Sequence, residues 1–224
     1  IYQEHPNLAF ENIRKAEEIA KNEGNKSMLA YVYLFYGRTY TLQNKLDTAL
    51  INYQKSLLLR QETNQVPEQA TCYKYIGDIY FQKGDYANAK DNYNKSLEKV
   101  DKQNDKDLYA HILNKESLIL AREGRLNEAT NYAFESLKTA GQVRANMAIH
   151  DALQALVEIS IKSKDYKSAS EFQQKVIQYN DTLFNQKLTE KIFSLEYQIE
   201  KQERNAKIEL LNRDNAIKEL RLKK

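Results

Sequence analysis

Apolar and polar residues recur along the chain with the spacing of amphipathic helices, and the whole pattern repeats every 40 residues. The recurring positions are mostly small or aromatic, and between the first two copies they pair as Gly37 with Gly77, Tyr40 with Tyr80, Ala49 with Ala89, Tyr53 with Tyr93 and Ser56 with Ser96. Further steps of the same length reach Ala129 and Ala169, and one step back reaches Ala9. Each copy predicts a first helix of about 14 residues, a short turn and a second helix of similar length. The pattern therefore predicts stacked helix pairs that begin with half a unit.

Glycine, aspartate and proline mark where these helices are expected to begin and end. Gly84 and Gly124 suit the left-handed residue that ends a helix, and Asp85 suits the N-cap of the next helix. Pro67 is predicted to lie in the connection between two units, where a helix could not continue. Small residues such as Gly37 are expected where two helices cross closely.

This arrangement resembles the tetratricopeptide repeat. The family's signature positions are held in the first full unit by Tyr33, Tyr36, Gly37, Tyr40, Ala49, Tyr53 and Ser56, and in the second by Tyr73, Ile76, Gly77, Tyr80, Ala89, Tyr93 and Ser96. The period is longer than the family's usual value of about 34 residues, and the third and fourth units lack the glycine and several aromatics. The resemblance implies an all-α, tetratricopeptide-like α-solenoid, a right-handed superhelix of helix pairs. It would comprise a half repeat and four repeats over residues 1–180.

Residues 181–224 follow a different pattern, in which the 40-residue register stops. Asn180 and Asp181 are predicted to cap the start of a separate long helix. An uneven apolar stripe runs along this helix through Phe184, Leu188, Ile192, Leu195, Ile199, Leu210, Ile217 and Leu220. Two interpretations remain open: the stripe covers the end of the solenoid as a cap, or it forms a homodimer in the manner of a coiled coil.

The C-terminal segment also resembles one bacterial architecture. From Lys201 onward there are eight cations and four anions, and the phrases NDTLFNQK and EKQERNAKIELLNRDNAIKELRLKK are similar to those of membrane-bound sensor proteins with tetratricopeptide repeats. The resemblance implies that a membrane helix and then a histidine-kinase or helix-turn-helix output region follow, outside this chain. We expect the repeats on the extracytoplasmic side of a bacterial membrane. The cytoplasm is the alternative, because basic residues beside a membrane span usually mark that side.

The composition offers little chemistry beyond protein binding. The chain has 224 residues, 42% of them hydrophobic and 29% charged, which are globular values, and its 6 Gly and 2 Pro argue against an all-β fold. A net charge of +3 does not indicate nucleic-acid binding. Cys72 reads as a packing residue, and His111 and His150 as packed or solvated ones, since no metal-binding motif accompanies them. We therefore expect no enzymatic activity, no metal and no cofactor.

The resemblance also implies a binding surface, because first helices line the concave wall of such solenoids. The residues carried onto this wall are Tyr31, Leu34, Arg38, Lys74, Asp78, Phe81, Gln82, His111, Asn114, Lys115, Arg122, Asp151, Gln154 and Glu158. Their mixture of aromatic, charged and amide groups would suit an extended peptide or a helix, although it would equally suit an ordinary solvated surface. Repeats that clamp a terminal carboxylate need asparagine at Asp78 and cations at Asp151 and Ala155, so that clamp is absent.

These observations predict a non-catalytic sensor region of a bacterial signal-transduction protein. A protein or peptide would bind the concave face, and the C-terminal helix would relay the event to an output domain. The alternative is a soluble scaffold or peptide-binding regulator built from the same repeats. In either case a membrane would be reached only through a segment outside this chain.

Overall fold

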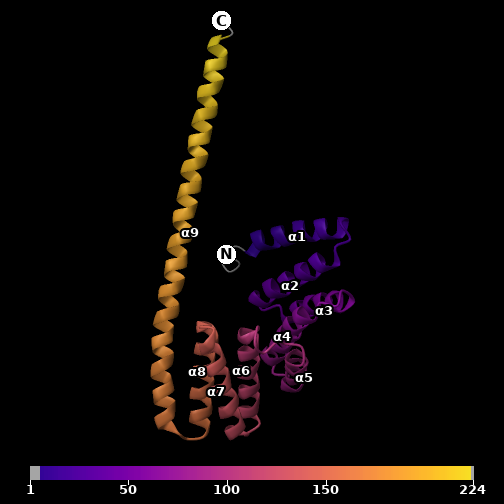
Figure 1. The fold of residues 1–224 in the computed structure, drawn as a ribbon, viewed down its shortest axis with the longest axis vertical. Coiled ribbons are helices and arrows are strands. Elements are labelled where there is room, and N and C mark those ends of the chain that lie inside the picture. The colour runs from indigo at the N-terminus through magenta and orange to yellow at the C-terminus, as the bar shows by residue number, and fades with distance from the viewer. Residues whose placement is uncertain (1–5, 223–224) are drawn as a thin grey trace. The chain divides into compact units, whose positions relative to one another are not determined.

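The computed structural model describes the backbone of residues 6–222, and the side chains of residues 9–213 apart from several positions between 182 and 198. Within this range the chain is entirely helical, which confirms the predicted all-α class. The nine described helices are α1 (Pro6–Asn22), α2 (Lys26–Leu42), α3 (Leu46–Glu62), α4 (Val66–Gln82), α5 (Tyr86–Leu97), α6 (Lys106–Arg122), α7 (Leu126–Gln142), α8 (Asn146–Lys162) and α9 (Tyr166–Leu222). Successive helices from α1 to α8 are joined by turns and pack against one another (Figure 1).

A new helix begins every 20 residues, so each 40-residue unit consists of two equal halves. Seven of the helices are 17 residues long, which is longer than the first helix expected from sequence and accounts for the long period. The intervening turns contain a residue with positive φ at Gly24, Asn44, Asn64, Gly84, Gly124, Arg144 and Lys164. The prediction for the turn glycines is confirmed, and four of these turns use a residue with a side chain instead.

Close helix crossings explain the paired glycine and tyrosine residues of the first two units. A Cβ atom on Gly37 would lie 2.5 Å from the ring of Tyr53, and one on Gly77 would lie 2.7 Å from the ring of Tyr93. Both tyrosines are almost fully buried. Each glycine therefore provides the space that a neighbouring ring fills.

Buried serines join the second helix of three units to the first helix. In each case the hydroxyl donates a 2.7 Å hydrogen bond to a backbone carbonyl of the first helix: Ser56 to Ala30, Ser96 to Ala70 and Ser136 to Ala110. All three side chains are fully buried. These bonds fix the two helices of a pair against each other as well as their apolar contacts do.

Two predicted boundaries are wrong. Pro67 lies in the first turn of α4, where the missing N–H has no helical partner to lose. Asn180 and Asp181 do not begin a helix, because α9 runs through them without interruption. By contrast, the predicted cap at Asp85 is confirmed, since its carboxylate accepts a bond from the Asn88 amide at 3.1 Å.

The chain divides into two units, Ile1–Val176 and Ile177–Lys224. In the second unit the side chains of Leu188, Ile199 and Leu210 are each about half exposed or more, as are those of Phe193, Tyr197, Ile208 and Leu211. The other stripe positions, Phe184, Ile192, Leu195, Ile217 and Leu220, have side chains outside the described residues. Among the described helices none combines the length and the apolar character needed to cross a bilayer.

Candidate binding surface

Three hollows lie on the first helices of the units, where the sequence predicted a binding wall. Hollow A, between α2, α3 and α4, is lined by Arg38, Thr41, Leu42, Tyr53, Tyr75, Asp78, Ile79 and Gln82. Hollow B, on α4, α6 and α8, is lined by Thr71, Lys74, Tyr75, Asp107, Leu108, His111, Met147, Ala148 and Asp151. Hollow C, on α6, α8 and the start of α9, is lined by Asn114, Lys115, Leu118, Asp151, Gln154, Ala155, Val157, Glu158, Ile161 and Gln173. Most of the predicted wall residues are thus brought together on this surface.

Four of the predicted residues lie outside the hollows. Leu34 is a correction, because its side chain is only 8% exposed and packs in the core with Ala49 and Ile76. Tyr31 is exposed and lies under the guanidinium of the buried Arg60, 4.4 Å from the ring centroid.

Phe81 and Arg122, the other two, lie next to each other. The Arg122 guanidinium lies 5.2 Å from the centroid of the Phe81 ring, and the Lys115 ammonium lies 5.1 Å from the same centroid. The ring thus holds two cations at the edge of the wall through cation–π contacts.

Asp78 is the centre of a polar network that links three consecutive helices. Its Oδ1 accepts a 2.8 Å bond from the Tyr93 hydroxyl and lies 3.0 Å from His111 Nε2, while its Oδ2 lies 3.0 Å from Lys74 Nζ. Burial opposes ionisation of Asp78, but the charges of His111, Lys74 and Lys115 outweigh it and hold the pKa of the carboxyl well below its usual range. The sequence placed Asp78 on the binding wall. The structure shows that its carboxylate already has partners within the protein.

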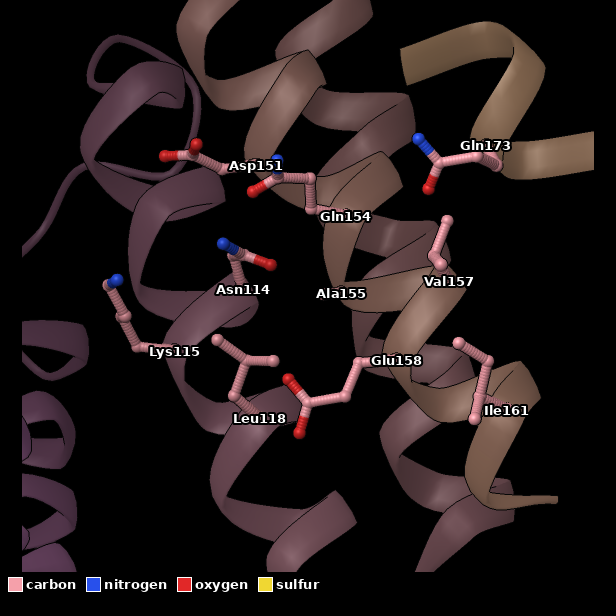
Figure 2. Close-up of a pocket in the computed structure, with 10 residues that line it drawn as sticks. All are labelled: Asn114, Lys115, Leu118, Asp151, Gln154, Ala155, Val157, Glu158, Ile161 and Gln173. Carbon is pink, nitrogen blue, oxygen red and sulfur yellow. The ribbon is translucent and has the colours of Figure 1, made fainter. Parts of the chain in front are cut away.

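Hollow C has an empty volume of about 450 Å³ and mixed chemistry. Figure 2 shows Asp151, Gln154 and Glu158 on α8 facing Asn114 and Leu118 on α6. Sequence reasoning missed Leu118 and Ile161, although the repeat register contains them. Leu118 stands 40 residues after Asp78, and Ile161 stands 80 residues after Phe81.

The described residues contain no cluster of three or more histidine, cysteine or acidic side chains suited to a metal ion. His150 Nδ1 lies 3.3 Å from Asp151 Oδ1, and Cys72 is fully buried beside the Ser56 hydroxyl. Burial raises the pKa of the Cys72 thiol. What the described surface offers is therefore a succession of polar and apolar contacts rather than a reactive group.

Comparison with known proteins places this geometry among repeat solenoids. Residues 76–98 match the sequence profile described as tetratricopeptide repeat. The crystal structure of BtubC (BKLC) from P. vanneervenii is similar with a TM-score of 0.63 and 14% identity, over 77% of this chain and 74% of that one. The putative kinesin light chain of Podosopora anserina, with nearly identical TPR-like repeats, is similar with a TM-score of 0.58 and 10% identity, over 82% and 92% of the two chains.

The fold is a tetratricopeptide-like solenoid. No curated protein sequence matches the chain. The structural likenesses establish the tetratricopeptide-like fold, and the predicted sensor role stays a prediction.

Proposed function

We propose that this tetratricopeptide-like chain is a non-catalytic binding region that holds an extended segment of a partner protein on the wall formed by α2, α4, α6 and α8. The observation that carries the proposal is the succession of three hollows on these helices. Each hollow combines charged or amide groups with apolar side chains, which is what an extended peptide needs for its alternating side chains and its backbone.

The finer proposal is that the chain is the sensor region of a bacterial signal-transduction protein and that α9 relays binding. Its support is the continuity of α9, whose first turns belong to the solenoid. Phe172 packs against the core cluster of Leu120 and Leu156 and contacts Phe134 edge to face, with centroids 5.8 Å apart. A change at the wall of α8 would therefore reach a helix that continues to Leu222 without a break. The extracytoplasmic location remains a prediction from the sequence resemblance.

We further propose that residues 181–224 form a homodimer. Apolar side chains at Leu188, Phe193 and Ile199 are exposed in the single chain, and a long polar helix gains stability mainly by packing such side chains against a partner. Light scattering on the full chain tests this proposal, which predicts twice the mass of 26.2 kDa.

A random peptide library displayed on phage tests the wall proposal. Peptides enriched on the wild-type chain are expected to lose binding when Gln82 and Gln154, two exposed wall residues in hollows A and C, are both changed to tryptophan. The matched control is Gln54→Trp on the second helix α3, also at an exposed position. No enrichment, or equal loss of binding in the control, would refute the proposal.

A further inference from the structure

Hollow C contains a buried hydrogen-bond acceptor that the protein itself does not use. The Asn114 side chain is only 3% exposed, and its Oδ1 atom has no hydrogen-bond partner. Buried polar atoms are nearly always paired in folded proteins, because an unpaired acceptor loses its bond to water without replacement. Asn114 lines the hollow and lies in it opposite Gln154 (Figure 2), so a ligand there can supply the missing donor.

The charges that border Asn114 in hollow C are negative. Asp151 and Glu158 extend from α8 into the same hollow, and their side chains are 38% and 39% exposed. Glu158 Oε1 lies 3.3 Å from Lys162 Nζ, so one carboxylate is partly balanced within the protein. Lys115 also lines the hollow, but its ammonium lies over the Phe81 ring, and Figure 2 shows it directed away from Asn114. The polar atoms facing Asn114 therefore favour a cation.

Apolar side chains complete the other part of hollow C. Leu118, Val157 and Ile161 line it below and beside the carboxylates (Figure 2). Lysine and arginine have this same division, with a methylene stem that packs on apolar surface and a charged end that seeks acceptors. A small inorganic cation would gain nothing from the apolar part.

We propose that hollow C binds a lysine or arginine side chain of the peptide that the wall holds, with Asp151, Glu158 and Asn114 Oδ1 as acceptors. This inference rests on the proposed function and adds the chemical class of the ligand. Hollows A and B contain the cations Arg38 and Lys74, which disfavour a basic side chain there. The cation therefore fixes which part of the peptide reaches α6 and α8.

The experiment uses the peptides enriched on the full chain from the phage library. A basic residue is expected at one fixed position, and its neutral counterpart, citrulline for arginine or acetyl-lysine for lysine, is expected to weaken binding at least about tenfold in calorimetric titration. In the variant Asp151→Asn, Glu158→Gln, this difference between the two peptides is expected to disappear. The control Glu171→Gln, at an exposed position of α9, is expected to retain it.

Asn114→Leu adds a second measurement that a purely structural role would not reproduce. Leucine stands at the equivalent position Leu34, and the substitution removes an unpaired buried acceptor, so the variant is expected to unfold at an equal or higher temperature. It is nevertheless expected to bind the basic peptide several-fold more weakly.

The outcomes separate the two proposals. If no peptide is enriched, or if all enriched peptides ignore the tryptophan variants of the wall, the proposed function itself fails. If peptides bind the wall without a fixed basic residue, or keep their preference for it in the Asp151, Glu158 double variant, only the assignment of hollow C is overturned.

Discussion

Glu116 predicts an unusual pH dependence of stability, because it is a carboxyl group at a core position. The residues 40 positions before and after it are Ile76 and Leu156, and both are buried in the solenoid. Glu116 is itself only 5% exposed, and its Oε1 has no hydrogen-bond partner. Burial raises the pKa of Glu116 to about 7, while Lys90 opposes the rise and Glu123 adds to it. The folded protein therefore keeps this group protonated at pH values where the unfolded chain does not.

The sign and size of the effect follow from this difference. Below pH 4.5, the ordinary value, Glu116 is protonated in both states and costs nothing. As the pH rises from 4.5 to about 7, the unfolded chain releases the proton while the folded protein retains it, so stability falls. Above that range the loss is constant. At about 1.4 kcal/mol per pKa unit it amounts to roughly 3 kcal/mol.

Urea unfolding of wild type and Glu116→Gln, followed by circular dichroism across this pH range, measures the effect. The variant is expected to match wild type at pH 4 and to be about 3 kcal/mol more stable at pH 8, since glutamine has the same size and cannot ionise. Glu98→Gln, an exposed position just after α5, is the control and is expected to change little at either pH. A stability difference that does not depend on pH, or a variant less stable than wild type at pH 8, would refute the reasoning.

Three further predictions concern packing and assembly. Gly77→Ala is expected to cost about 1–3 kcal/mol in urea unfolding because its Cβ would overlap the neighbouring tyrosine ring, whereas Gly141→Ala, which meets no atom within 4 Å, is expected to be neutral or stabilising; equal effects would contradict the packing argument. Ser96→Ala is expected to cost about 1 kcal/mol by the same assay, because it leaves a buried carbonyl unpaired, and a neutral result would show that the bond contributes nothing. Leu188→Lys combined with Ile199→Lys is expected to convert a dimer into a monomer in light scattering, and an unchanged mass would exclude this stripe as the interface.

The repeating units could be predicted because the side chains that set the helix crossings are visible in the sequence. Gly37 and Tyr53 recur as Gly77 and Tyr93, and the structure shows that each pair is a single contact. The turn at Arg144 could not be predicted from residue type, since a residue with a long side chain there has positive φ. Its place in the 20-residue rhythm would have revealed it.

Other features depend on contacts that a local pattern does not contain. The network of Asp78 joins residues from three helices, so its carboxylate looked free for a ligand although Tyr93 and His111 already occupy it. Asn180 and Asp181 are good capping residues, but the same side chains are tolerated on the surface of a continuous helix when tertiary packing holds its first turns. Leu34 was assigned to the wall by register alone, whereas its burial depends on the neighbouring α3 and α4.

The most direct test of the binding wall is photo-crosslinking of a library-selected peptide to the full chain, with the attachment sites read by mass spectrometry. If α2, α4, α6 and α8 form the binding surface, the crosslinks will fall on these four helices and will be lost in the variant with tryptophan at Gln82 and Gln154. Crosslinks concentrated on α1, α3, α5 and α7 would contradict the account.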